Sequence, residues 1–449
     1  PTGAHCAGTW RTALAASGDL GMARPSANGM GGRRTGRGGR RTSPKRIFSM
    51  AVSRPLVIGV DATTWWNSRG FGRFTRGMLG SMLAQPRGHK FVLFVDQDPT
   101  EELRRSNVEI VRVPTSSTVV ASAVADGSRR VADLLAFRRA AAARSLDVFW
   151  FPAVYSWYPI ARSVPTVVTF HDAIAERFTD LVLPALRGRL FWNLKVWLAR
   201  KSAQHVVTVS NAAREEIARH LRIPIDTISV ILEAADAKFA PVTDPRALRL
   251  AREEAGLPLD KRLILYVGGL APHKNLAGLI QGFAQASSEH YNLADVDLVL
   301  AGDPAGGGFH SNVAALHSLV AHHRLQERVH FPGYVSDEIL PALYSTAMMV
   351  AMPAFSEGFG LPAAEAIACS TPVIASSGGA VEEVVGPAGA YFDPGDPISI
   401  AAAIGQLAHD KSRLEQLRRE CLPRAASMSW SHSASAMLNV LEAHARRPA

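Results

Sequence analysis

The sequence predicts an α/β fold with two doubly wound, mainly parallel sheets in separate domains. From about residue 55, short apolar runs alternate with longer helical patterns, which is typical of a parallel sheet covered by helices on both faces. The alternation stops in a polar segment with two prolines at 236–256 and then starts again. The length of 449 residues allows two or three domains. We therefore expect two domains, with ligands bound in the cleft between them.

The first half contains seven apolar runs of strand length with helical patterns between several of them. The expected strands are 56–60, 91–96, 109–113, 147–152, 165–170, 205–209 and 228–232. The expected helices are 72–84, 129–144, 182–202 and 211–220. Residues 51–238 are assigned to this first domain.

The second half repeats the same alternation after the polar segment. The expected strands are 262–268, 296–301, 328–332, 348–352, 372–375 and 390–392. Residues 239–429 are assigned to the second domain. A last helical pattern at about 430–446 begins near Trp430, and we expect it to pack back onto the first domain.

The net charge of +10 is concentrated in residues 1–50, which hold nine Arg or Lys and a single acid, Asp19. This tail is rich in Gly, Arg, Ser and Thr and is expected to be disordered, as an extension before Met50 without a function of its own. A transit peptide and an RNA-binding segment are the alternatives. The remaining residues carry only +2, so we expect no nucleic-acid partner.

The cysteines and the apolar runs indicate the cellular environment. Cys6, Cys369 and Cys421 are far apart and odd in number, which argues against a disulfide framework or a zinc site. No apolar run is long enough to span a membrane. We expect a cytoplasmic protein.

The most informative segment is 355–366, which reads Phe-Ser-Glu-Gly-Phe-Gly-Leu-Pro-Ala-Ala-Glu-Ala. It follows a buried strand pattern, and Pro362 suits the first turn of a helix. Its glycines allow a ligand to approach the backbone, and the free N–H groups of a helix start favour an anion. Glu357 and Glu365 add two acceptors for sugar hydroxyls, so the segment suits a nucleotide sugar. Taken alone, such a glutamate pair is more often a helix cap and a solvated face.

Glycine loops follow the first strand of each half. In the second half, Gly268 and Gly269 precede Lys274, whose ammonium could neutralise a diphosphate; a solvated lysine is the alternative. In the first half, a loop with Gly70, Gly72 and Arg73 leads into a helix. Its position makes it a candidate phosphate contact, although an ordinary tight turn explains a lone Gly-x-Gly equally well.

Two further strand ends carry candidate groups. His171 ends the strand at 165–170 and can meet a ligand in the cleft, or it can be a structural histidine that is hydrogen-bonded to Asp172. Val335 lies in the turn after the strand at 328–332, where free backbone groups could contact a base. Asp297 is interpreted as polarity at the start of a strand, and no metal is expected.

The helical pattern at 182–202 places large apolar residues beside Arg and Lys. A basic amphipathic helix can lie on an anionic membrane surface. A core helix with solvated basic side chains is the more common arrangement. A peripheral membrane contact through 182–202 therefore stays open.

With these features placed, the chain resembles the retaining glycosyltransferases of the GT-B fold, in the large group often called family four. The resemblance covers about residues 56–446 and implies two Rossmann-like domains that face each other across a cleft. Its specific signature is the Glu-x7-Glu segment at Glu357 and Glu365. Supporting matches are Gly70-Phe71-Gly72-Arg73, His171-Asp172, Thr208-Val209-Ser210, Lys274 and Gly333-Tyr334-Val335.

The resemblance implies a role for each matching residue. Glu357 would hold hydroxyls of the transferred sugar, and Glu365 would accept from the ribose hydroxyls. Lys274 would neutralise the diphosphate and assist the leaving group, while His171 would lie beside the sugar at the reaction centre. The backbone contacts would be those of Gly358, Phe359, Gly360 and Leu361 with the diphosphate and of Val335 with the base.

One position departs from the family pattern. The family places an Arg shortly before the Lys, where this chain has Gly269. The guanidinium that would clamp the diphosphate is therefore missing from its usual place, and Arg73, Arg69 or His273 are the candidates to replace it.

The resemblance implies transfer of a hexose from a nucleoside-diphosphate sugar to a glycan or a lipid-linked glycan, with retention of the anomeric configuration and no cofactor or metal. The segments 272–275 and 233–236 look like those of bacterial mannosyltransferases of surface polysaccharide synthesis, which favours GDP-mannose and leaves a UDP-sugar open. The alternatives are an epimerase or phosphorylase on the same fold, and a non-catalytic protein that binds a nucleotide sugar.

Overall fold

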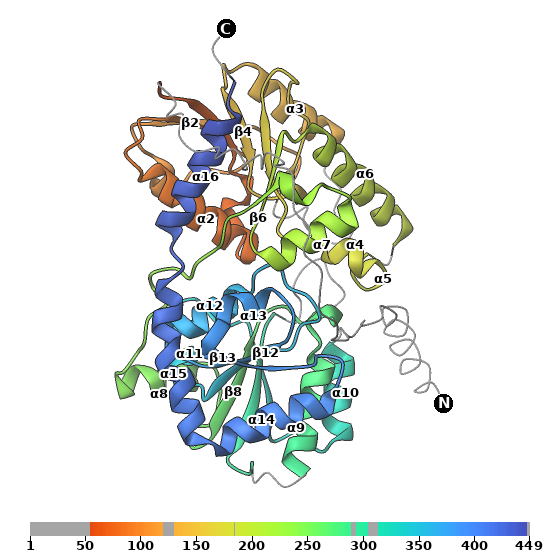
Figure 1. Ribbon diagram of the computed structural model, residues 1–449, viewed down its shortest axis with the longest axis vertical. Coiled ribbons are helices and arrows are strands. Elements are labelled where there is room, and N and C mark those ends of the chain that lie inside the picture. Colours follow the sequence, from red (N-terminus) through yellow and green to blue (C-terminus); the bar gives the residue numbers. More distant parts are fainter. Residues whose placement is uncertain (1–53, 120–129, 184, 289–292, 304–312, 447–449) are drawn as a thin grey trace, which may run out of the picture. The chain divides into compact units, whose positions relative to one another are not determined.

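The computed structural model describes residues 54–119, 130–183, 185–288, 293–303 and 313–446 (Figure 1). The expected tail at 1–50 lies outside the described residues. None of the described helices is long and apolar enough to cross a membrane.

The first domain is built on a parallel sheet of seven strands in the order β3-β2-β1-β4-β5-β6-β7. The strands are β1 Val57–Asp61, β2 Lys90–Val95, β3 Val108–Arg112, β4 Val148–Phe151, β5 Thr166–Thr169, β6 His205–Thr208 and β7 Ile228–Val230. β4 and β5 are buried at every position, because helices cover both faces of a parallel sheet. All seven predicted strands of the first half are confirmed to within two residues at each end.

The helices of the first domain are α2 Gly70–Leu83, α3 Val131–Ala142, α4 Ile174–Arg177, α5 Thr179–Val182, α6 Leu186–Ser202 and α7 Asn211–Leu221. The predicted single helix at 182–202 is wrong at its start, since α5 ends at Val182 and α6 begins at Leu186. The sequence has Pro184 between them, and the residue before a proline avoids the helical conformation.

The second domain repeats the architecture with a parallel sheet of six strands in the order β10-β9-β8-β11-β12-β13. The strands are β8 Arg262–Val267, β9 Val296–Ala301, β10 Val329–Gly333, β11 Met349–Met352, β12 Val373–Ser376 and β13 Gly389–Phe392. The six predicted strands of this half are confirmed as well.

The helices of the second half are α8 Pro245–Glu254, α9 Leu276–Ser288, α10 Val313–His322, α11 Leu340–Thr346, α12 Leu361–Ala368, α13 Ala380–Val385, α14 Pro397–His409 and α15 Lys411–Ala426. The polar segment at 236–256 contains α8, which begins at Pro245. Asp244 caps this helix, because its side chain accepts a hydrogen bond from the Arg246 N–H. α9 and α14 lie side by side (Figure 1) and approach closely at Gly282, where a Cβ would lie 2.6 Å from Ile400.

The final helix, α16 Trp430–His444, lies along α2 of the first domain (Figure 1). The Trp430 ring meets Phe74 with centroids 6.0 Å apart, and a Cβ at Gly77 would lie 2.3 Å from the indole. The Gln85 amide donates to the Ser435 hydroxyl over 2.8 Å. The end of the chain therefore stabilises the helix that follows the first strand.

Each sheet reverses its strand order at one place, between β1 and β4 in the first sheet and between β8 and β11 in the second. Ligands of open parallel sheets bind outside the carboxyl ends of the strands at such reversals. The loop before α2 follows β1, and the predicted loops before Lys274 and Glu357 follow β8 and β11. The topology thus gathers the predicted groups at the carboxyl edges of the two sheets.

Candidate functional site

The turn between β11 and α12 depends on its two glycines. Gly360 has a φ of 92° and is the N-cap of α12, a left-handed conformation that favours glycine. A Cβ on Gly358 would lie 2.4 Å from the backbone oxygen of His171, which is in the first domain. The absence of a side chain at Gly358 therefore lets the loop approach the end of β5. Pro362 lies in the first turn of α12, as predicted.

Lys274 and Glu357 form an ion pair beside this turn. The Lys274 Nζ donates to the two carboxylate oxygens of Glu357 over 2.7 and 2.8 Å. The backbone N–H of Phe355 donates to the His273 carbonyl over 3.0 Å, which ties the loop after β11 to the short turn Pro272–Lys274. Both side chains are mostly buried, so the pair places a positive and a negative group at one point of the site.

Glu365 is buried and is paired with Arg73, which comes from α2 of the first domain. The Tyr344 hydroxyl donates to the other carboxylate oxygen of Glu365 over 3.0 Å. The Arg73 guanidinium also pairs with Asp337, and Lys238 donates to Asp337 over 2.7 Å. These contacts form a charged cluster that joins the two domains, and its Asp337, Tyr344 and Lys238 were not predicted from the sequence.

Burial raises the pKa of Glu365 to about 7, and the charge of Arg73 opposes the shift. Loss of hydration is the largest cause, because the carboxylate lies inside the protein. The protonation of Glu365 therefore changes near neutral pH. Its capacity to accept hydrogen bonds from a ligand's hydroxyls depends on pH in the same range.

His171 is buried at the end of β5 and is held on both ring nitrogens. Its Nε2 lies 2.9 Å from the Pro152 carbonyl oxygen, and its Nδ1 lies 3.3 Å from Glu233. The alternative of a bond to Asp172 is wrong, because both ring nitrogens have other partners; the Asp172 carboxylate accepts from the Ile174 N–H at the start of α4. Burial raises the pKa of Glu233, and the bond to His171 opposes that shift.

Two phenylalanines of α2 contact the His171 ring edge to face. The ring centroids are 5.0 Å away for Phe71 and 4.6 Å away for Phe74. Phe71 also contacts Tyr155, with centroids 4.9 Å apart. The helix that carries Arg73 therefore also fixes the orientation of the histidine.

The first residues of α7 also meet the second domain. The Ser210 hydroxyl donates to the Gly358 carbonyl over 2.6 Å and accepts from the Ala213 N–H, which caps α7. The Glu383 carboxylate accepts from the Asn211 and Ala212 N–H groups. An acidic group at a helix N-terminus is favourable. Glu383 could not be found from the sequence, because the N–H groups that it binds lie in the other domain.

The remaining predicted residues lie around these groups. Gly70 is exposed at the start of α2, and Gly72 is buried, where a Cβ would lie 1.7 Å from the Asn67 carbonyl oxygen. Gly72 is therefore required by packing whatever it binds. The other predicted positions divide by exposure: Gly269 is exposed and Gly268 half-buried, while Val335, Phe359 and Leu361 are buried.

The structure separates the three candidates for the missing guanidinium. Burial, with the nearby charge of Lys274, lowers the pKa of His273 to about 3, so His273 is neutral at physiological pH. His273 therefore supplies no positive charge, and that part of the hypothesis is wrong. Arg69 is exposed at the N-cap of α2. Arg73 is the candidate that contacts the predicted site.

Asp297 lies at the start of a strand, as predicted, but it is not at the surface. Asp297 is buried within β9, and its carboxylate lies 2.8 Å from the Nε2 of His330 on the neighbouring strand. Arg328 approaches the same carboxylate at 3.7 Å. Among the described residues, no group of three or more His, Cys, Asp or Glu side chains has a metal-binding arrangement.

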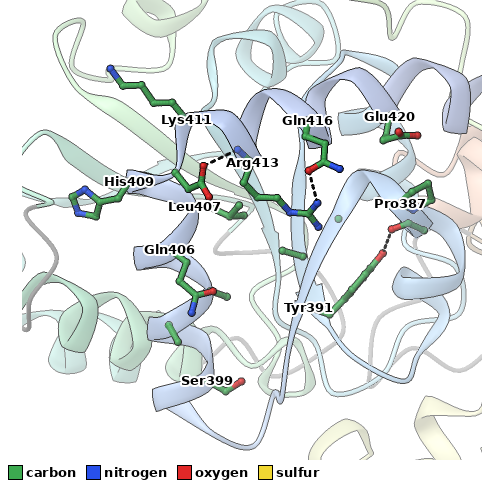
Figure 2. Close-up of a pocket in the computed structure, with 16 residues that line it drawn as sticks. Pro387, Tyr391, Ser399, Gln406, Leu407, His409, Lys411, Arg413, Gln416 and Glu420 are labelled. Carbon is green, nitrogen blue, oxygen red and sulfur yellow. Dashed lines mark hydrogen bonds between the residues drawn. The ribbon is translucent and has the colours of Figure 1, made fainter.

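A separate pocket of about 1,280 Å³ lies between β13, α14 and α15 (Figure 2). The Tyr391 hydroxyl donates to the Gly386 carbonyl over 2.5 Å, and Arg413 donates to Gln416 over 2.8 Å. The lining of this pocket includes none of the predicted site residues, so the pocket is distinct from the site at the strand ends. The dashed lines in Figure 2 mark hydrogen bonds among the residues that line the pocket.

Two Rossmann-like domains with charged groups at the carboxyl edges of both sheets define a protein of the GT-B architecture. Family comparison gives the particular group: residues 70–239 match the model of Glycosyltransferase Family 4, and residues 249–424 match that of Glycosyl transferases group 1. The chain belongs to this family of glycosyltransferases and is an enzyme of that class.

Similar proteins come from bacterial glycan and inositol chemistry. The O-antigen chain mannosyltransferase B of Escherichia coli is 33% identical over 284 residues, which cover 63% of this chain and 72% of that protein. The D-inositol 3-phosphate glycosyltransferase of Xylanimonas cellulosilytica is 30% identical over 311 residues, which cover 67% of this chain and 72% of that protein.

Solved structures share the fold at low sequence identity. The sucrose-phosphate synthase of Thermosynechococcus elongatus superposes with a TM-score of 0.65 at 20% identity, covering 86% of this chain and 98% of that one. Anabaena HepE in complex with UDP and glucose superposes with a TM-score of 0.63 at 19% identity, covering 86% and 99%. These likenesses confirm the predicted GT-B fold.

Proposed function

We propose that the protein transfers a hexose from a nucleoside-diphosphate sugar to a glycan or a lipid-linked glycan, with retention of the anomeric configuration. The observation that carries the proposal is the pair of carboxylates on either side of the Gly358–Leu361 turn, each joined to a cation: Glu357 to Lys274 and Glu365 to Arg73. A donor of this class offers hydroxyls to the acids and a diphosphate to the cations.

In this proposal the second domain holds the donor. Glu365 accepts from the ribose hydroxyls, and Glu357 holds hydroxyls of the transferred sugar. Backbone N–H groups from Gly358 to Leu361, at the start of α12, face the diphosphate, which a helix N-terminus favours. The backbone at Val335 meets the base, and the backbone of Gly268 and Gly269 lines the loop before Lys274.

The reaction requires stabilisation of a departing diphosphate and of a cationic sugar. Positive charges fixed in a partly buried site can supply the first, and we assign this role to Lys274 with Arg73. Gly70 and Gly72 allow the start of α2 to approach the same phosphates. His171 is placed beside the transferred sugar. The diphosphate itself would take the acceptor proton on the face that it leaves, which accounts for retention without a covalent intermediate.

The donor and the acceptor follow from the relatives. GDP-mannose is the favoured donor because the Escherichia coli relative is named as a mannosyltransferase. A UDP-sugar is the alternative donor because the solved structure of Anabaena HepE is in complex with UDP and glucose. The proposed acceptor is a growing glycan, free or carried on a lipid.

The surroundings of the reaction follow from the same chemistry. We place the protein in the cytoplasm, with residues 51–238 on the acceptor side and 239–429 on the donor side. A lipid-linked acceptor would bring residues 182–202 close to a membrane in a peripheral contact. No metal, cofactor or nucleic-acid partner is part of the proposal.

The test is a transfer assay with the full chain and GDP-mannose, UDP-glucose or UDP-N-acetylglucosamine, each with and without EDTA. Thermal shift with the same donors first identifies which one stabilises the protein. We expect one nucleotide sugar to be selected, turnover to survive EDTA, and NMR of the product to show the anomeric configuration of the donor.

Three results would contradict parts of the proposal. An inverted product would remove the retaining mechanism. Loss of all turnover in EDTA would point to a metal. Binding of a donor without hydrolysis or transfer to any glycan or lipid-linked glycan would limit the protein to donor recognition.

A further inference from the structure

Helix α6 lies on the outer side of the first domain (Figure 1), and it exposes an apolar face. Six of the fourteen exposed large hydrophobic side chains among the described residues lie on this one helix, with exposed fractions from 38% to 74%. They are Leu186, Leu190, Phe191, Leu194, Trp197 and Leu198. Scattered surface hydrophobics are ordinary, but a contiguous group of this size indicates a contact surface.

The opposite side of α6 makes the usual core contacts. Val196 and Ala199 are buried in the hydrophobic core of the first domain. The Trp192 indole donates to Glu176 over 2.8 Å. The helix is therefore held by one face, and the exposed apolar residues are surplus to folding. The interpretation of 182–202 as a core helix with solvated basic side chains is therefore wrong for these six apolar residues.

The charge on α6 has one sign. The helix carries five basic residues and no acid: Arg187, Arg189, Lys195, Arg200 and Lys201. Arg189, Lys195 and Arg200 donate to backbone carbonyls of the first domain, at Leu183, Tyr155 and Leu221. Arg187 and Lys201 are exposed at the two ends of the apolar face. A partner that fits this surface therefore has an apolar region to contact the hydrophobic side chains and negative charge to pair with Arg187 and Lys201.

A small cavity beside Trp197 adds a place for an anionic group. Its volume is about 170 Å³, and Arg200, His220 and Arg222 line it together with Glu176. Arg222 ends α7 in a left-handed conformation and is exposed. Arg200 and Arg222 thus lie next to Trp197, at one end of the apolar face, although Glu176 lines the same cavity.

We propose that α6 is a docking surface for an anionic lipid bilayer, with Leu190, Leu194 and Trp197 entering the acyl boundary and Arg187 and Lys201 contacting headgroups. Interfacial helices combine a wide apolar face with basic residues and tryptophan in this way. The 17 residues of α6 extend about 25 Å along the surface. The inference rests on the proposed function only in one respect: the purpose of the membrane contact would be to bring the enzyme to a lipid-linked acceptor.

Charge argues against the other occupants. A second copy that packed α6 against α6 would bring two basic helices together. Residues 1–50 carry a net charge of +8, so this tail would also be repelled. An acidic protein would satisfy the charge, but the exposed face offers few hydrogen-bonding side chains for the polar rim of a protein interface.

The experiment is sedimentation of the full chain with vesicles, without any donor. One set is pure phosphatidylcholine, and the other contains equal parts of phosphatidylcholine and phosphatidylglycerol. We expect binding to the anionic vesicles, and a loss of about tenfold or more in partitioning for the double variant Leu190→Ser and Trp197→Ser. Arg187→Glu with Lys201→Glu should lower partitioning by a similar factor.

The matched control is Ile398→Ser with Leu250→Ser, which removes equally exposed apolar side chains from α14 and α8. It should bind as the wild type does. Melting temperature and thermal shift with donor show whether each variant is folded, so failure of the docking surface is distinguishable from failure of the proposed function.

Three outcomes would overturn the inference. Binding to neither kind of vesicle would exclude a membrane as the partner. If both α6 variants still bind anionic vesicles, the membrane contact lies on another surface, such as the basic tail. A dimer of the wild type that the apolar variant dissociates would make a second copy the occupant.

Discussion

Arg73 and Glu365 form an ion pair that joins the first helix of one domain to α12 of the other, across 292 positions of the chain. Tyr344 holds the second oxygen of the same carboxylate. The atoms that would accept ribose hydroxyls are thus engaged within the protein. Glu365 is also buried, so we expect donor binding to shift Arg73 or Tyr344 and to bring the guanidinium toward the diphosphate.

Replacing Glu365 should weaken donor binding severely. Glu365→Ala removes the proposed acceptor of the ribose hydroxyls and leaves Arg73 and Tyr344 without it, so we expect at least a tenfold loss of affinity, about 1.4 kcal/mol. Glu365→Gln keeps the size and removes the charge. Titration calorimetry measures both, with Glu254→Gln on the exposed side of α8 as control. Unchanged affinity in Glu365→Ala would exclude the ribose role.

Donor affinity should increase as the pH rises through about 7, the pKa to which burial raises Glu365. Below that pH the carboxyl is protonated and has lost acceptor capacity. The effect on folding stability has the opposite sign. The pKa of Glu365 in the folded state lies above the ordinary 4.5, so between pH 4.5 and about 7 the folded protein binds more protons than the unfolded chain. The contribution of Glu365 to the free energy of unfolding therefore falls as the pH rises through this range. A pH series of wild type and Glu365→Gln checks this, since the slope in affinity should vanish in the variant.

Lys274→Ala should lower turnover by more than about tenfold, the scale of one lost charge contact on the leaving diphosphate. Because Lys274 is also the partner of Glu357, the double variant with Glu357→Gln should lose less than the two single losses combined. Single-turnover kinetics measure the effect. Lys411→Ala, an exposed lysine at the start of α15, is the matched control. Strict additivity would show that the pair does not act as a unit.

Arg73→Ala should reduce turnover, and Gly269→Arg should restore part of it. The Gly269 position is exposed, has no heavy atom within 4 Å of an added Cβ, and keeps the backbone oxygen that accepts from Tyr266. An arginine there is therefore expected to fold and to return a guanidinium to its usual family position. The single variants and the pair are compared by turnover and melting temperature. No recovery in a folded double variant would mean that Arg73 does not substitute for the missing arginine.

Gly358→Ala should impair both folding and turnover. The added Cβ would lie 2.4 Å from the His171 carbonyl oxygen, a backbone atom that cannot turn away. We expect about 1–3 kcal/mol of destabilisation, the usual cost of overpacking. Gly379→Ala is the control, because nothing lies within 4 Å of its Cβ and its φ is −129°. Denaturant unfolding of both variants measures the difference, and equal stabilities would contradict the close approach.

The secondary structure could be predicted because it is encoded locally. Buried parallel strands are continuous apolar runs, and β4 lies within one residue of the run that predicts it at each end. The turn at Gly358 and Gly360 was recognisable for the same reason, since its glycines and Pro362 are adjacent in the sequence. The break between α5 and α6 was missed, although Pro184 marks it, because the apolar pattern continues across it.

The partners of the site residues could not be predicted. For His171 the sequence offers a bond to its neighbour Asp172 as one of two alternatives, whereas the ring is held by Pro152 and Glu233, each on a different loop. The position of Asp297 at the start of a strand likewise gives no sign of His330 on the next strand. Such contacts join elements that are far apart in the chain.

By itself the sequence determined the order of strands and helices and their division into two sheets, because apolar periodicity, glycines and prolines act on neighbouring residues. Only the tertiary structure decided which side chains meet. It placed Arg73 against Glu365, made His273 neutral by burying it, and turned the apolar side of α6 outward. These outcomes depend on burial and on distances between elements, and both arise only when the sheets and helices pack together.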